Sequence, residues 1–183
     1  MRGHRVLLID ADPQVSLTIS LGIKNPDAVD ITLANKLDAM MNDRTIVAHE
    51  GILRHPEGMD LLPSNIELSG TETSLFNTMS RETILKNYIN MIKPDYGYIL
   101  IDCMPSLGMM TINALTACDS VIISSQPSYL SAKGMDLLFK SIAKVKRSIN
   151  PDLKINGILM TMVDGRTNNA REVIITLRDV WIR

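Results

Sequence analysis

The sequence predicts an α/β domain whose parallel sheet is covered by helices on both faces. Four short apolar runs lack the alternation of a half-exposed strand: Val6–Ile9, Tyr98–Ile101, Val121–Ile123 and Ile155–Met160. Such runs are typical of parallel strands that are buried on both faces. Stretches with helical spacing of apolar residues separate the runs, and strands that alternate with helices are the pattern of a parallel α/β domain.

The first half of the chain contains a predicted strand, a helix and a weaker strand. After the strand at Val6–Ile9, Thr32 is placed to cap a helix over Leu33–Met41. The weaker strand candidate, Met59–Leu62, ends at Pro63, because proline cannot donate a hydrogen bond to a neighbouring strand.

Two further helices are expected in the second half. Ser80 is placed to cap a helix over Arg81–Ile92, which Pro94 ends. The helix over Ala132–Ile149 is the best defined, because apolar residues repeat at i, i+4, i+7 and i+11, namely Leu138, Ile142, Val145 and Ile149.

Composition restricts the class of protein. The chain has 183 residues, 45% of them hydrophobic and 21% charged, and a net charge of -1. These values indicate a globular protein and exclude a disordered one. Cys103 and Cys118 have no metal-site or disulfide-framework spacing, and no apolar run approaches the ~20 residues of a membrane helix. We therefore expect one domain over residues 1–183, in the cytoplasm and without a membrane partner.

Carboxylates follow two of the predicted strands. Asp10 and Asp12 come directly after Val6–Ile9, and Asp102 comes directly after Tyr98–Ile101. Ligands of parallel sheets bind beyond the carboxyl ends of the strands, where a carboxylate can hold Mg²⁺ through water and Mg²⁺ can bridge nucleotide phosphates. Taken singly, a turn with a helix cap explains Asp10 and Asp12 about as well, and a strand-to-helix turn explains Asp102. Two strands that end in aspartate within one chain favour the joint metal-site interpretation, although they do not identify the site.

Several strings resemble the ParA/MinD family of deviant-Walker ATPases, and most closely its partition branch. The string from Arg5 to Gln14, RVLLIDADPQ, is similar to the second conserved block of that family. Residues 98–108 resemble its Walker B strand and loop, and Gln126-Pro127 and residues 164–168 follow in the expected order. The resemblance spans nearly the whole chain and implies a P-loop NTPase-like fold.

The resemblance also implies roles for individual residues. Asp102 would be the Walker B carboxylate that holds Mg²⁺, Asp12 would position the hydrolytic water, and Asp10 would support the outer shell of the metal. Thr161 and Met162 would lie near the adenine of ATP.

The function implied by the resemblance is the segregation of plasmids or chromosomes. The family uses ATP and Mg²⁺ to form a homodimer that binds DNA without sequence specificity. A ParB-like partner, bound to a centromere-like site, then stimulates hydrolysis.

The resemblance fails at the phosphate-binding loop. None of the ten glycines is followed by lysine, so the Gly-Lys loop of the family is not encoded in these residues. We expect a partial domain, truncated at both ends, with unpaired sheet edges beside the missing first strand and without useful ATP hydrolysis.

A non-catalytic interaction module or gene remnant that binds no nucleotide is the alternative. A relative of the cobyrinic acid synthases is a third hypothesis, which Asp12-Pro13-Gln14 and Asp164-Gly165-Arg166-Thr167 disfavour.

Overall fold

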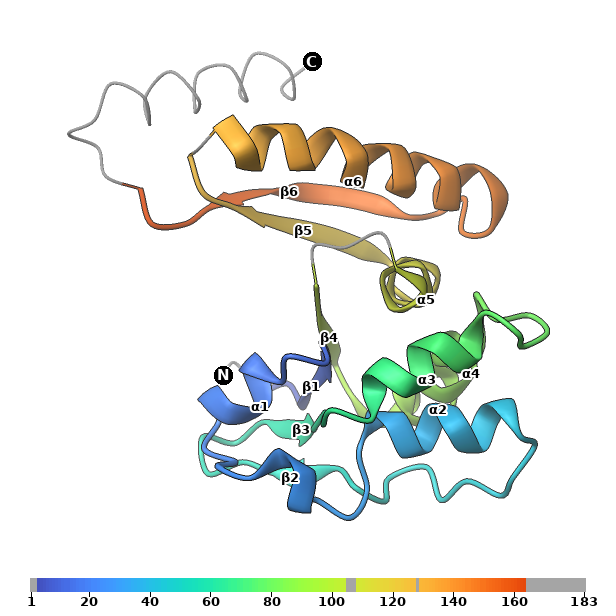
Figure 1. The fold of residues 1–183 in the computed structure, drawn as a ribbon. Helices are drawn as coiled ribbons and strands as arrows, with labels where there is room; N and C mark the ends of the chain where they lie inside the picture. Colours follow the sequence, from blue (N-terminus) through green and yellow to red (C-terminus); the bar gives the residue numbers. More distant parts are fainter. Residues whose placement is uncertain (1–2, 105–107, 128, 164–183) are drawn as a thin grey trace. The chain divides into compact units, whose positions relative to one another are not determined.

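The chain divides into two compact units, Met1–Ala117 and Cys118–Arg183, which are described one at a time. The computed structural model describes residues 3–104, 108–127 and 129–163, and for residues 129–133 it describes the backbone alone. Figure 1 shows the helices and strands of both units. In the part of the chain that is described, no helix combines the length and the apolar character needed to cross a bilayer.

The first unit is built on a four-stranded sheet in the order β2-β3-β1-β4. β1 (Val6–Ala11) lies in the interior of this sheet and pairs in parallel with β3 (Asp60–Leu62) and β4 (Tyr98–Cys103). β2 (Leu53–Arg54) adds an antiparallel edge to β3. The three parallel strands confirm the predicted α/β class. β2 was not predicted, since a strand of two exposed residues has no sequence pattern.

Helices connect the strands of this unit. They are α1 (Ser16–Ser20), α2 (Leu33–Met41), α3 (Leu68–Leu75), α4 (Ile84–Ile92) and α5 (Met109–Ala117), with 3₁₀ turns at Pro26–Ala28 and Lys93–Asp95. α2 has the predicted bounds. At its start the Thr32 N–H donates to Oδ1 of Asn35 at 2.8 Å, so the third residue of the helix closes the capping interaction that the sequence predicts.

The core of the first unit joins β1 to the helices. Leu7 and Ile9 of β1 are fully buried, in one cluster with Leu37 of α2 and with Leu85 and Tyr88 of α4. Burial of each such side chain contributes about 1.5–3 kcal/mol to folding. The hydroxyl of Tyr88 donates to the Ala48 carbonyl at 3.0 Å, so its polar end is satisfied.

The predicted start of α4 is wrong, because the helix begins at Ile84 rather than at Arg81. Residues 80–83 form a turn in which Ser80 has a φ of 53° and accepts a hydrogen bond from the Thr83 hydroxyl at 2.8 Å. The helix start is held by Asn113 of α5, whose Oδ1 accepts the Leu85 N–H at 3.1 Å and whose Nδ2 donates to the Arg81 carbonyl at 2.8 Å. A cap supplied by a residue 28 positions away leaves no local sequence signal.

The second unit is a β-α-β arrangement. β5 (Ser120–Ser125) and β6 (Lys154–Met160) pair in parallel, and α6 (Tyr129–Ser148) connects them. The predicted apolar stripe of this helix is confirmed at Ile142 and Val145, which are buried. The Asn150 side chain donates to the Cys118 carbonyl at 2.9 Å and thereby ties the end of the helix to the start of β5.

The Asn113 contacts generate a prediction about stability. We expect Asn113→Ala to lower the free energy of unfolding by about 1–3 kcal/mol, because it leaves the buried Leu85 N–H without its partner. The measurement is urea unfolding followed by circular dichroism. Asn90→Ala, at an exposed position of α4, is the matched control and should change the stability by less than about 0.5 kcal/mol. Equal losses in both variants would contradict the role of Asn113.

Candidate functional site: the carboxylate edge

Three aspartates converge at the carboxyl ends of β1 and β4. In the parallel pairing of these strands Asp10 lies opposite Asp102, and Asp12 follows β1 by one residue. All three therefore lie at the same end of the sheet, as the metal-site interpretation requires. We call Asp10, Asp12 and Asp102 the carboxylate edge.

Asp10 is fully buried and accepts three hydrogen bonds. Its Oδ2 accepts the Thr18 N–H at 2.8 Å and the Thr18 hydroxyl at 2.6 Å, and its Oδ1 accepts the Asp12 N–H at 3.2 Å. Thr18 is the third residue of α1, so Asp10 satisfies an N–H group that the first turn of a helix leaves unpaired. The N-cap residue of α1 is Val15, so Asp10 supports the turn and the first turn of the helix without being the cap residue. Both of its carboxylate oxygens have donors.

A buried hydrogen-bond chain links Asp10 to the end of β3. The Thr18 hydroxyl, which donates to Asp10, accepts the Ser64 N–H at 3.1 Å. Ser64 lies two residues beyond β3, and its own Oγ is buried without a hydrogen-bond partner in the described part of the chain. The positions of β1, α1 and β3 at this edge are therefore coupled. Neither Thr18 nor Ser64 was a predicted site residue.

Asp12 shapes the turn that follows β1. Its Oδ1 accepts the Gln14 N–H at 2.8 Å, and its carbonyl accepts the Val15 N–H at 3.0 Å. Val15 has a φ of 54°, a left-handed conformation that is costly for a β-branched residue. Asp12 is half-buried, so its carboxylate stays accessible to solvent at the edge.

The electrostatics of the edge are those of clustered negative charge. Desolvation by neighbouring atoms, followed by the charges of Asp10 and Asp12, raises the pKa of Asp102 above its ordinary value. Neighbouring carboxylates disfavour ionisation of one another when no cation lies between them. A cation at this edge would relieve the repulsion.

The donor set fits a hydrated Mg²⁺ better than a directly ligated one. Within the residues that the structure describes, no group of three or more His, Cys, Asp or Glu side chains is placed to hold a metal ion. Mg²⁺ commonly keeps several of its waters and uses one or two carboxylates. Asp102, exposed on β4, and Asp12 suit this kind of contact, whereas the buried Asp10 accepts the Asp12 N–H.

β4 is the outer strand of its sheet. One face of it carries Tyr98 and Leu100, which are 57% and 54% exposed. Among the described strands, no further strand pairs with the outer edge of β4. Beyond the strand, the Glu72 carboxylate of α3 accepts the Met110 N–H at 3.1 Å and fixes the first turn of α5.

Thr161 and Met162, the two residues predicted to lie near the adenine, are in the second unit, at the carboxyl ends of β5 and β6. The Thr161 N–H donates to the Ser125 carbonyl at 2.8 Å. Met162 has a φ of 51° and is 83% exposed. Residues 105–107 and 164–168, which carry parts of the family resemblance, lie outside the described residues.

Comparison with known proteins finds relatives that are named Soj and ParA. A family model described as an AAA domain matches residues 1–155. The sporulation initiation inhibitor protein Soj of Bacillus subtilis is 41% identical over 174 residues, which are 94% of this chain and 66% of Soj. The chromosome partitioning protein ParA of Myxococcus xanthus is 41% identical over 177 residues, which are 96% of this chain and 60% of ParA. The chain thus spans less than two thirds of the length of these relatives.

Solved structures agree on the fold. The cobyrinic acid a,c-diamide synthase of Mycobacterium smegmatis matches with a TM-score of 0.89 and 38% identity, over 99% of this chain and 71% of that protein. A structure of the same synthase with bound ADP and magnesium matches with a TM-score of 0.88 and 39% identity, over 97% of this chain and 70% of that one. A plasmid partition protein of Borrelia burgdorferi, at 24% identity and a TM-score of 0.76 over 98% of this chain and 72% of that one, supports the fold alone.

The raised pKa of Asp102 generates a pH-dependent prediction. An acid whose pKa is higher in the folded than in the unfolded protein destabilises the fold once it is ionised. We therefore expect Asp102→Asn to stabilise the protein at pH 7, by less than about 1 kcal/mol because the side chain is exposed. The gain should disappear as the pH falls through the ordinary aspartate pKa of about 4. Thermal unfolding at a series of pH values measures this, with Asp30→Asn on an exposed loop as the control. A loss of stability at pH 7 would contradict it.

Proposed function

Because the chain belongs to the ParA/Soj group of AAA-domain proteins, we propose that it forms most of the nucleotide-binding domain of an ATPase that segregates plasmids or chromosomes. The observation that carries the proposal is the in-register pairing of Asp10 with Asp102, together with Asp12 at the same end of the sheet. This is the place where a parallel α/β sheet binds its ligand.

The proposed cofactors are ATP and Mg²⁺. Asp102 would contact the metal through water, Asp12 would orient the attacking water, and Asp10 would hold both in place through the turn. When bound, Mg²⁺ neutralises charge on the phosphates during phosphoryl transfer. Thr161 and Met162 would contact the adenine. The synthase structure with ADP and magnesium supports this cofactor pair at the level of the shared fold.

The 183 residues as they stand are proposed to bind no ATP. A phosphate cradle needs consecutive backbone N–H groups and a lysine, and no glycine-lysine pair occurs in the sequence. The carboxylate edge alone would repel a triphosphate. The hydrogen-bonding edge of β4, the outer strand of its sheet in the described part of the chain, is where a further parallel strand carrying such a cradle at its carboxyl end would pair.

The partners that we propose are those implied by membership of the ParA/Soj group. A cytoplasmic homodimer, non-specific DNA and a ParB-like centromere-binding protein would act with the complete ATPase. A non-catalytic role as an interaction module is the second candidate, favoured by the missing cradle. A synthase function is a third candidate, supported by the 38% identity to the Mycobacterium smegmatis enzyme.

The proposal predicts that ATP binding depends on a phosphate loop supplied from outside these residues. Calorimetric titration of the 183-residue chain with ATP and Mg²⁺ should give no saturable binding with a dissociation constant below about 100 μM. A fusion that places a strand, a Gly-Lys loop and a helix from a partition ATPase before Met1 should bind ATP. The same fusion with the loop lysine changed to alanine is the matched control and should bind much more weakly.

Two results would count against the proposal. Saturable micromolar binding by the unfused chain would show that the carboxylate edge needs no cradle. A folded fusion that binds no ATP would remove the carboxylate edge as a nucleotide site. If the fusion binds ATP, Asp102→Asn in that background should weaken the Mg²⁺-dependent part of the affinity.

A further inference from the structure

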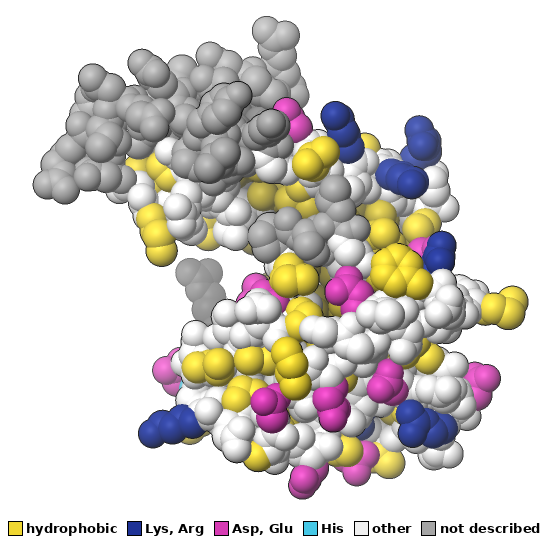
Figure 2. All heavy atoms as spheres, in the orientation of Figure 1, with side chains coloured by type: hydrophobic (Ala, Val, Ile, Leu, Met, Phe, Trp, Pro, Cys, Tyr) yellow, Lys and Arg dark blue, Asp and Glu magenta, His cyan; other side chains and the backbone are white. Residues whose placement is uncertain are grey.

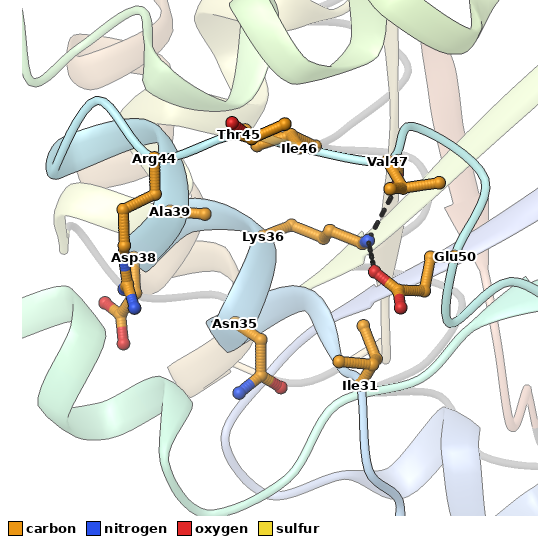
Figure 3. Close-up of a pocket in the computed structure, with 10 residues that line it drawn as sticks. All are labelled: Ile31, Asn35, Lys36, Asp38, Ala39, Arg44, Thr45, Ile46, Val47 and Glu50. Atoms are coloured by element: carbon orange, nitrogen blue, oxygen red, sulfur yellow. Dashed lines mark hydrogen bonds and ion pairs between the residues drawn. The ribbon is translucent and has the colours of Figure 1, made fainter.

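A pocket of about 400 Å³ lies beside α2, between this helix and the segment 44–50 that follows it (Figure 3). This volume falls within the range of about 300–1,000 Å³ that is usual for small-molecule sites. No residue of the carboxylate edge lines the pocket. Its chemistry is therefore separate from the proposed partition function.

The wall of the pocket contains a buried lysine. Lys36 is only 3% exposed and lies on the same buried face of α2 as Leu33 and Leu37. Lysine is almost never fully buried without a partner, because the ammonium group loses its hydration. A lysine at a core position of an apolar helix face therefore calls for an explanation in terms of what the ammonium binds.

The protein satisfies this ammonium incompletely. Nζ donates to the Val47 carbonyl at 2.9 Å and lies 3.5 Å from Oε2 of Glu50. An ammonium has three N–H groups, and the described residues provide these two acceptors. Burial lowers the pKa of Lys36, although the Glu50 carboxylate acts in the opposite direction. The site thus has room for an acceptor that lies closer to Nζ than the Glu50 carboxylate does.

Glu50 is a displaceable partner. Its side chain is 54% exposed and reaches Lys36 from the rim of the pocket (Figure 3). A long contact made by an exposed carboxylate contributes little to stability, so an incoming carboxylate could replace it at small cost. Figure 2 shows the charged side chains on one face of the molecule.

We propose that this pocket binds a small carboxylic acid whose carboxylate displaces Glu50 from the Lys36 ammonium. The other donors lining the pocket favour the same class of ligand. The oxygen of Asn35 is already taken by Thr32, which leaves the amide N–H₂ group as a donor, and Thr45 adds a hydroxyl. Ile31 and Ile46 supply apolar wall for the body of the acid. Arg44 and Asp38 both line the end of the pocket that lies away from Glu50. Their charges are opposite, so this end carries no net charge.

The test is a titration of the full chain with benzoate, followed by the backbone amide signals in two-dimensional NMR. Benzamide, of the same shape but uncharged, is the ligand control. Benzoate should shift the signals of residues 31–50 in a saturable way, and benzamide should not. Equal shifts with both ligands would overturn the carboxylate assignment.

Two variants separate binding from folding. Glu50→Gln removes the competing carboxylate from an exposed position. Benzoate should then bind at least about threefold more tightly, because the state in which no protein carboxylate contacts the Lys36 ammonium is fully populated. Lys36→Met keeps an unbranched side chain and should abolish the shifts, while Lys140→Met, on the exposed side of α6, should leave them unchanged. If Lys36→Met does not fold, the change in affinity in Glu50→Gln decides. Absence of saturable shifts in both the wild type and Glu50→Gln, or shifts that persist in folded Lys36→Met, would overturn the proposal.

Discussion

The parallel pairing of β1 with β4 is the constraint on which the candidate site depends. Because the side chains of a strand alternate between its faces, a slip of one residue would move Asp102 to the other face of the sheet and away from Asp10. The observed register, from Val6 opposite Tyr98 to Ala11 opposite Cys103, fixes the two aspartates side by side. The buried Leu7 and Ile9 hold β1 in this register, since a slip would expose them.

Two kinds of interaction oppose each other at this edge. Asp10 is compensated by the donors of Thr18 and Asp12 and so supports the fold. At Asp102, desolvation by neighbouring atoms and then the charges of Asp10 and Asp12 raise the pKa above its ordinary value. The structure therefore keeps negative charge at the carboxyl end of the sheet at a cost in stability. Sites that bind a cation or act on a charged ligand commonly accept such a cost, because the ligand repays it on binding.

Much of the fold could be predicted from local patterns. The apolar runs at Val6–Ile9 and Tyr98–Ile101 predict parallel strands, and both strands form. The predicted burial holds for Leu7 and Ile9 of β1 but is wrong for β4, where Tyr98 and Leu100 are exposed. The aspartates that follow the two runs lie together at the carboxylate edge. The start of α4, the link from Thr18 to Ser64 and the burial of Lys36 could not be predicted. The first two depend on contacts between residues that are distant in sequence, and the third depends on how deeply a side chain is buried. Local periodicity of the sequence encodes neither of these.

If Asp10, Asp12 and Asp102 form one electrostatic unit, the titration of Asp102 must depend on the charge of Asp12. The carboxyl carbon shift of Asp102 can be followed against pH by NMR in the wild type and in Asp12→Asn. We expect a wild-type midpoint above the ordinary aspartate pKa of about 3.9, and a lower midpoint once the charge of Asp12 is removed. A midpoint at the ordinary value that does not respond to Asp12→Asn would contradict it.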